Sequence, residues 1–336
     1  MSSTMIRVIA QYLLRCVATL LIVPLVVNAA TSPVNDVSNP PKFRVGSSEA
    51  SAGLSAFWNE PADIRTRDLF YGAGGKENQP VGPFVFLKED RDGTSPKFSV
   101  RDVKGVEWKV KLGVEARPET VASRFVWAAG YYVDEDYFLP YLKVDRMQRL
   151  HRGANRIAPD GSMQNVRLKR EGKKIGEWKW RHDPFEGTRA WNGLRVLMCL
   201  INNWDLKDSN TAIRVIGGQR VYIISDLGAS FGAGGWRLRV RDSKGNLQKY
   251  ERSRFIAKVT PEYVTFGVPS RPELFHHFMW IGKRISRADA QWIGKLLGNL
   301  SPTQIQAAFR GAGYQPAEAA RFSAVVKERI AELERL

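Results

Sequence analysis

The chain has 336 residues, of which 43% are hydrophobic and 11% aromatic, and it carries a formal net charge of +17 at pH 7. This composition excludes a largely disordered chain, because it supplies enough apolar surface for a substantial core, divided between two domains or lobes. The charge indicates an anionic partner, such as a phosphate-bearing ligand, a membrane surface or a nucleic acid, and by itself it does not choose among them.

The N-terminus has the pattern of a secretory signal. Arg7 and Arg15 precede the apolar run CVATLLIVPLVV, and small residues follow it in VNAA. This run is shorter than the roughly 20 residues that a membrane-spanning helix requires. We therefore expect a signal peptide over residues 1–30 and an exported protein, periplasmic or secreted, with an uncleaved membrane anchor as the alternative. Residues 31–56, rich in Pro, Ser and Asn, predict a linker.

Three strands are predicted next. FVFLKED at 84–90 and KFSVRD at 97–102 flank the turn RDGTSP, whose Asp, Gly, Ser and Pro residues favour a hairpin. In VEWKVKLG, at 106–113, apolar and charged residues alternate, as in a strand with one buried face.

An amphipathic helix follows in RPETVASRFVWAAGY, with Pro118 and Glu119 near its start. Beyond it, YFLPYLKV at 137–144 predicts a strand and VRLKREGKKIGEWKW at 166–180 predicts a hairpin. The strands and this helix together predict a β-rich N-terminal lobe over residues 57–147.

Helical patterns dominate the remainder. TRAWNGLRVLMCLINNW, from Thr188 to Trp204, is apolar on nearly every face toward its end, which predicts a buried helix with Cys199 as a buried free thiol. TAIRVI and RVYIISDLG predict a short hairpin, and SPTQIQAAF begins a helix that Ser301 caps. We expect an α+β chain whose mainly helical C-terminal lobe spans residues 148–336.

Three oxygen donors lie on loops of this second lobe. Asp205 and Asn210 stand in DLKDSN after the buried helix, and Asp226 stands in DLG after a strand. Mg²⁺ prefers carboxylate and carbonyl oxygens and keeps ligand phosphates in its shell. Phosphoryl transfer requires such donors, with a group that orients the attacking hydroxyl and a lysine that neutralises nucleotide phosphates. The sequence therefore predicts a site for Mg²⁺ and a phosphorylated ligand.

WDLKDSN resembles the catalytic loop of the protein-kinase-like superfamily, H-R-D-L-K-x-x-N, and DLG resembles its D-F-G. The resemblance implies a bilobal fold and an ATP- and Mg²⁺-dependent transfer of the γ-phosphoryl group to a hydroxyl. It implies that Asp205 is the catalytic base and that Lys207 contacts phosphate. Asn210 and Asp226 would be the metal ligands.

Two residues of the first lobe take roles from the same resemblance. Lys111, in WKVK, looks like the lysine of the family's third strand, and Glu119 on the following helix looks like its ion-pair partner. Lys109 competes with Lys111 because both lie on one face of the strand, and we prefer Lys111 for its place at the strand's end. Glu115 competes with Glu119, but it precedes the predicted start of the helix.

The turn of the first hairpin falls where the family's glycine-rich loop covers the nucleotide. This turn lacks the repeated glycines of that loop. Its candidates for contact with phosphate are Gly93, Thr94 and Ser95.

Other departures place the resemblance with the atypical branches of the superfamily. Asn203 and Trp204 stand where a typical protein kinase keeps His and Arg, and no A-P-E follows DLG. DLGASFG is similar to the metal-binding strand of phosphoinositide kinases and of HipA-like kinases. The resemblance covers residues 84–230.

The motifs do not identify the acceptor, since a protein hydroxyl, a sugar and a lipid headgroup all require the same transfer machinery. Export to a compartment poor in ATP predicts an alternative function, a catalytically silent binding module that recognises an anionic component of the cell envelope. Nucleic acid is the least expected partner. KREGKKIGEWKWRH interleaves aromatic with basic residues, but export argues against this reading.

Overall fold

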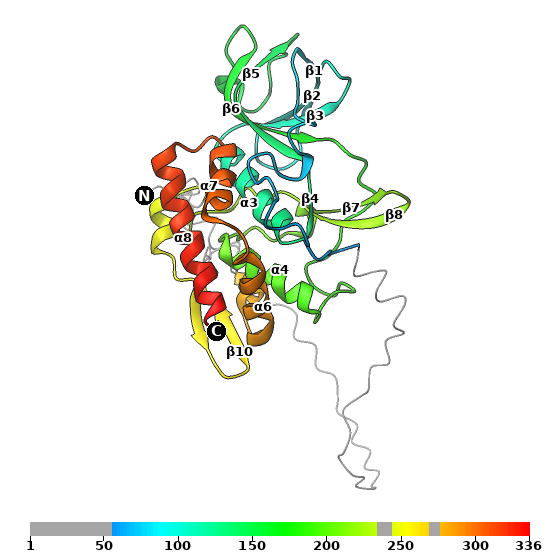
Figure 1. Cartoon of the computed structure of the whole chain (residues 1–336). Helices are drawn as coiled ribbons and strands as arrows, with labels where there is room; N and C mark the ends of the chain where they lie inside the picture. Colours follow the sequence, from blue (N-terminus) through cyan, green and yellow to red (C-terminus); the bar gives the residue numbers. More distant parts are fainter. Residues whose placement is uncertain (1–55, 234–243, 269–275) are drawn as a thin grey trace, which may run out of the picture. The chain divides into compact units, whose positions relative to one another are not determined.

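The computed structural model describes residues 56–233, 244–268 and 276–336, all of which belong to one unit of the chain, Gly46–Leu336 (Figure 1). The predicted signal peptide and nearly all of the predicted linker lie outside these residues. Within the described ranges, no helix is both long and apolar enough to cross a membrane.

A closed barrel of strands forms the first part of the fold, in the order β1-β2-β3-β6-β5. β1 and β5 are parallel, and the other neighbours are antiparallel. The three predicted strands are confirmed as β1 to β3, and the strand predicted at 137–144 is confirmed as part of β5. The barrel strands are β1 (Phe84–Asp90), β2 (Lys97–Arg101), β3 (Glu107–Lys111), β5 (Asp136–Asp145) and β6 (Ser162–Arg170).

The predicted hairpin over 166–180 is wrong. Its first residues belong to β6, which pairs with β3 and β5, and its second half contributes only an isolated bridge between Gly176 and Ile213. The reason is that Trp178 and Trp180 pack in the core among the helices. Burial of these side chains, and not strand pairing, fixes the position of this segment. The barrel takes strands from both sides of residue 147, where the sequence places the end of the first lobe.

The rest of the described chain combines helices with two small sheets, ordered β4-β8-β7 and β11-β10-β9, which confirms the α+β class. In Figure 1 the barrel lies at the top of the view and α6, α7 and α8 lie below it. The helices are α3 (Ala116–Ala128), α4 (Arg189–Leu200), α5 (Leu247–Arg252), α6 (Arg287–Leu297), α7 (Pro302–Gly311) and α8 (Pro316–Glu334). The remaining strands are β4 (Tyr132–Val133), β7 (Thr211–Ile216), β8 (Gln219–Ile224), β9 (Ile256–Val259), β10 (Tyr263–Phe266) and β11 (Ile285–Ser286). The 3₁₀ helices are η1 (Gly72–Gly74), η2 (Ala154–Arg156), η3 (Asp208–Asn210) and η5 (His276–Gly282).

Two large hydrophobic cores organise these elements. One fills the barrel, and the other lies among the helices and includes the apolar face of α3. α4 begins at the cap Thr188, whose hydroxyl accepts from the Trp191 amide, and its buried end confirms Cys199 as a buried free thiol. Burial raises the pKa of this thiol to about 12, as expected of an unreactive cysteine.

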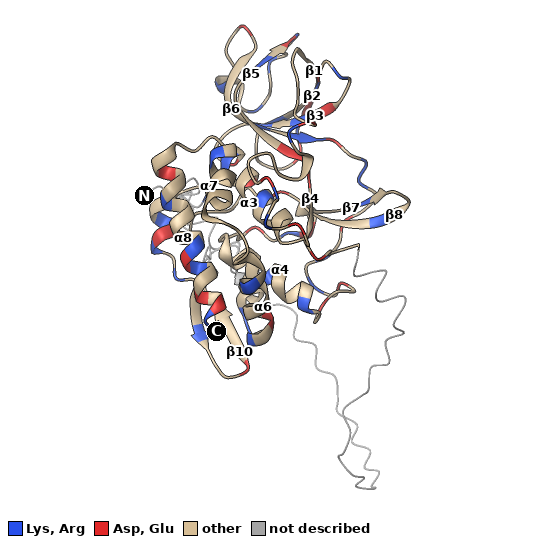
Figure 2. Cartoon of the chain, viewed as in Figure 1, with Lys and Arg blue, Asp and Glu red and all other residues tan. Residues whose placement is uncertain are grey.

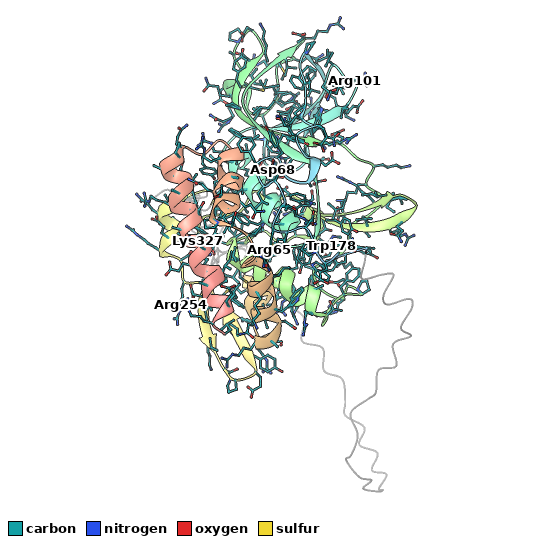
Figure 3. The ribbon with its side chains drawn as sticks, in the orientation of Figure 1. Arg65, Asp68, Arg101, Trp178, Arg254 and Lys327 are labelled. Atoms are coloured by element: carbon teal, nitrogen blue, oxygen red, sulfur yellow. The ribbon has the colours of Figure 1, made fainter. Side chains whose placement is uncertain are left out.

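The two tryptophans of the segment KREGKKIGEWKWRH, Trp178 and Trp180, are buried, whereas many basic residues of the chain lie on the surface. Trp178 lies among packed side chains in Figure 3 and is 2% exposed, so it is not available to stack on a nucleic-acid base. Arg254 and Lys327 are exposed. Figure 2 shows Lys and Arg both on strands of the barrel and on α7 and α8, so the positive charge is not confined to one element.

Helix α7 starts at the predicted cap. The Ser301 hydroxyl accepts from the Gln304 amide, while the Gln304 side chain accepts from the Ser301 amide, forming a capping box with Pro302 at the first helical position. The side-chain nitrogen Nε2 of Gln304 also donates to the backbone carbonyls of Ile64 and Arg67. The box therefore ties the start of the described chain to the C-terminal helices.

Ser301→Ala is expected to lower the free energy of unfolding by about 1 kcal/mol, because the Gln304 amide loses its partner. Urea denaturation measures the loss. Thr303→Ala, an exposed change within the same helix, is the matched control and should change stability by less than about 0.5 kcal/mol. Equal losses in both variants would contradict the role of the cap.

Candidate active site

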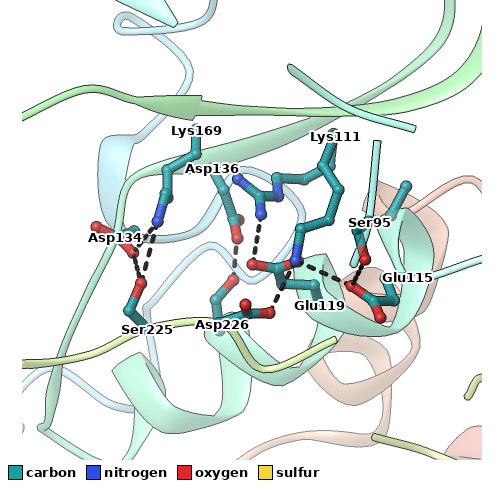
Figure 4. A network of polar contacts seen from close by, with 12 residues as sticks. Ser95, Lys111, Glu115, Glu119, Asp134, Asp136, Lys169, Ser225 and Asp226 are labelled. Carbon is teal, nitrogen blue, oxygen red and sulfur yellow. Dashed lines mark hydrogen bonds and ion pairs between the residues drawn. The ribbon is translucent and has the colours of Figure 1, made fainter. Parts of the chain in front are cut away.

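Lys111, the last residue of β3, lies at the centre of a cluster of carboxylates (Figure 4). Its ammonium nitrogen is 3.0 Å from Oε2 of Glu115, 2.7 Å from Oε2 of Glu119 and 2.8 Å from Oδ1 of Asp226. Glu115 and Glu119 come from the start of α3, and Asp226 follows β8. The structure thus brings together two segments that lie more than a hundred residues apart in the sequence.

The charges of this cluster stabilise one another. Burial favours neutral forms, yet the nearby carboxylates outweigh it and raise the pKa of Lys111. Burial also opposes ionisation of the two acids, but the Lys111 ammonium holds the pKa of Asp226 well below its usual value. With help from Lys244, it lowers the pKa of Glu115 to about 2. Lys111, Glu115 and Asp226 are therefore ionised near neutral pH.

The two choices left by the sequence now have structural answers. Lys109 turns to Asp90, 2.7 Å away, and does not enter the cluster, so Lys111 is the lysine at the site. Glu119 contacts Lys111 as predicted, but Glu115 does so as well, from the N-cap position of α3. Because α3 begins at Ala116, earlier than expected, Glu115 lies at the N-cap position, beside Lys111.

Arg167 is a member of the site that sequence reasoning missed. It faces Lys111 across the β3–β6 ladder, and its Nη2 lies 2.5 Å from Oε1 of Glu119, with the arginine side chain 2% exposed. Glu119 therefore bridges two buried cations, one through each oxygen. Val166 and Leu168, on either side of Arg167, pack in the barrel core, so alternation in the sequence places Arg167 on the other face of the strand. The register that places Arg167 opposite Lys111 is not visible in the sequence.

The segment around Asp226 is held from both sides. The Ser225 amide donates to the Asn210 carbonyl at 3.1 Å, and its hydroxyl bonds Asp134, which also pairs with Lys169 at 3.0 Å. Asp226 itself has a φ of 47°, in the left-handed region, and its side chain is 44% exposed. These contacts fix the turn and leave the Asp226 carboxylate accessible.

Gly228 has a steric role in the same turn. A Cβ atom at this position would lie 2.8 Å from the Cβ of Glu115, which is closer than real Cβ atoms approach. Glycine therefore allows the DLG segment to lie directly against the start of α3.

The predicted catalytic loop forms a compact hydrogen-bonded turn. The Lys207 ammonium lies 2.8 Å from Oδ1 of Asp205, and the Asn210 side chain donates to the Asp205 carbonyl at 2.7 Å. The Asp205 amide donates to Oδ1 of Asn203 at 3.1 Å. Asn203 is buried and orients the backbone of Asp205.

A pocket of about 430 Å³ joins these elements, within the range usual for small-molecule sites. Five predicted residues line it: Gly93, Lys111, Glu119, Asn210 and Asp226. The lining also includes Lys109, the competitor of Lys111, and cations that the sequence did not single out: Lys97, Arg167, Lys169, Lys174 and Arg214.

The other predicted residues lie outside this lining. Asp205 and Lys207 contact each other, and the carbonyls of both accept hydrogen bonds from Asn210. The Ser95 hydroxyl donates to Oε2 of Glu115 at 2.8 Å, and Thr94 is exposed. Arg152 donates to the Gly93 carbonyl and thereby stabilises this turn.

Asn210 and Asp226 in the pocket lining carry oxygen donors of the kind that Mg²⁺ prefers. The amide nitrogen of Asn210 is engaged with the loop backbone, and within the described residues its Oδ1 has no partner. One amide oxygen and one carboxylate leave room for phosphate oxygens and water in an octahedral shell. Oxygens of Glu115, Glu119 and Asp226 also lie within 4.8 Å of one another, but the Lys111 ammonium already contacts all three residues.

Comparisons with known proteins give a remote structural similarity. No family model matches the sequence, and no curated protein matches it. The crystal structure of a Helicobacter pylori proinflammatory kinase, CtkA, is similar at a TM-score of 0.45 and 11% sequence identity, covering 75% of this chain and 96% of that chain. A likeness this remote leaves the function to be argued from the residues of the chain itself.

The charge cluster predicts an acid-sensitive stability. The pKa of Glu115 is about 2 in the folded chain and about 4.3 when unfolded, so its contribution is full above pH 5 and is lost as the pH falls toward 2. The difference in unfolding free energy between wild type and Glu115→Gln is expected to shrink by about 2 kcal/mol between pH 7 and pH 3, in urea denaturation.

Glu262→Gln provides the control, because Glu262 is an exposed residue between β9 and β10. It should change stability by less than about 0.5 kcal/mol at both pH values. A difference between wild type and Glu115→Gln that does not vary with pH would contradict the charge assignment.

Proposed function

We propose that the protein is an ATP- and Mg²⁺-dependent phosphotransferase of the kinase-like type, with the barrel and the helical part as its two lobes. The observation that carries the proposal is the position of Lys111. Its ammonium joins Glu119 on α3 to Asp226 after β8, in a pocket that Asn210 also lines. A lysine held in this way beside oxygen donors for a metal is what phosphoryl transfer requires.

Each residue has a role that its surroundings support. Lys111 neutralises nucleotide phosphates, and Glu119 and Arg167 fix its position. Asn210 and Asp226 would hold Mg²⁺, whose positive charge would offset the negative charge of the phosphate groups. Asp205 accepts the proton of the attacking hydroxyl. It is partly exposed and its carboxylate is ion-paired to Lys207, which contacts the transferred phosphate group.

The turn between β1 and β2 covers the phosphates through its backbone near Gly93, which lines the pocket. The acceptor is a hydroxyl of a protein, sugar or lipid, and the export expected from the sequence favours a component of the cell envelope. The silent binding module is the outcome that remains if the pocket binds no nucleotide.

Wild-type protein is expected to gain thermal stability from ATP with Mg²⁺, because a ligand that binds only the folded state raises the unfolding temperature. Asp226→Ala should lose this stabilisation, since it removes a metal ligand. Asp205→Ala should keep it and lower transfer at least about 100-fold, since it removes only the base. Transfer is measured with labelled ATP and the native cell-envelope fraction.

Asp145→Ala, at an exposed position on β5, is the control and should leave binding and transfer unchanged. Equal nucleotide affinity in Asp226→Ala and wild type would contradict the metal assignment. No stabilisation of wild type by the magnesium nucleotide would overturn the enzyme proposal.

A further inference from the structure

A second pocket, of about 380 Å³, lies at the start of α3. None of the residues that line it lines the candidate active site. Its volume falls within the lower part of the range for small-molecule sites. The lining is mostly polar and includes Gln164 and Asn165 from β6. The pocket is therefore separate from the proposed nucleotide site and has its own chemistry.

Three cations from three segments line this pocket. Arg117 belongs to the first turn of α3, Arg156 ends η2, and Lys244 precedes α5. Among the described residues, the one carboxylate in the lining is that of Glu318, in the first turn of α8. The lining is therefore net positive, and the N-terminal end of α3 adds a favourable dipole for an anion.

Two of these cations lack an anionic partner. Within the described residues, neither Arg117 nor Arg156 forms an ion pair. The candidate active site differs, because Lys111, Lys169 and Arg214 in its lining are each paired with a carboxylate. Unpaired guanidinium groups that face a pocket offer charged donors for a ligand.

Arg117 is held in place without losing its donors. Its guanidinium carbon lies 5.7 Å from the centre of the Phe138 ring and 5.5 Å from that of Tyr314. Its Nη2 donates to Oδ1 of Asn165 at 3.3 Å. A guanidinium group has five N–H donors, so most of those of Arg117 are available in a preset orientation.

From this geometry we propose that the pocket is a binding site for a phosphate-bearing anion. The forks of Arg117 and Arg156 match phosphate oxygens, and Lys244 adds a point charge. The size of the pocket suits a ligand with one or two phosphate groups and a small polar body, or the phosphate headgroup of a lipid.

Lys244 connects this pocket to the charge cluster. Its ammonium contacts Oε1 of Glu115, whose other oxygen lies 3.0 Å from Lys111. A test of the pocket therefore leaves Lys244 unchanged, because its replacement would also disturb Glu115.

Inorganic pyrophosphate without Mg²⁺, at fixed ionic strength, is the probe for calorimetric titration of the full chain. Arg117→Gln/Arg156→Gln is expected to weaken binding at least about tenfold, because two charge-assisted contacts are lost. Arg220→Gln/Lys258→Gln removes the same charge from exposed positions on β8 and β9 and should bind like wild type.

Equal affinity in wild type and Arg117→Gln/Arg156→Gln overturns the proposal, because any binding then belongs to the candidate active site. An equal loss in both double variants overturns it too, because net charge alone would explain the result. A parallel arm with vesicles containing phosphatidic acid identifies the source of the phosphate. Binding to vesicles but not to pyrophosphate, lost only in Arg117→Gln/Arg156→Gln, assigns a lipid headgroup. The nucleotide experiments do not enter this test, so either proposal can fail alone.

Discussion

The buried ammonium of Lys111 is the constraint on which the rest of the site depends. A lysine that is 3% exposed remains charged only if carboxylates surround it, and these come from α3 and from the turn after β8. Lys111 lies on a strand of the barrel, α3 packs in the helical core, and Asp226 follows the β7–β8 hairpin. Removing one charge weakens the compensation of the others, so the folding of these elements and the geometry of the pocket are coupled.

Local patterns were sufficient to predict most of the elements. The hairpin turn RDGTSP, the alternation in VEWKVKLG and the Ser301 cap each predict a feature that depends on neighbouring residues, and each is present in the structure. The predicted hairpin over 166–180 is wrong, because a local strand-like pattern does not show which segment a strand pairs with. Burial of Trp178 and Trp180 in a core formed by distant residues overrides that pattern.

The candidate site was predictable to the extent that its residues lie in short motifs. Lys111, Glu119, Asn210 and Asp226 come from such motifs, and the structure gathers them around one pocket. Arg167 and the full engagement of Glu115 depend on cross-strand register and on where a helix begins. Both are set by tertiary packing and not by local sequence. The assignments of Asp205 and Lys207 remain proposals about chemistry.

The contact between Gly228 and Glu115 separates two reasons for keeping the DLG motif. Any side chain at position 228 would push against Glu115 and displace the start of α3, whether or not a ligand is bound. This glycine is therefore required by packing alone. Asp226 and Asn210 also have structural contacts, with Lys111 and with the Asp205 carbonyl, but the Asn210 amide oxygen has no such contact among the described residues. The glycine alone thus reports on architecture, whereas a metal would be the reason to keep the free oxygen of Asn210.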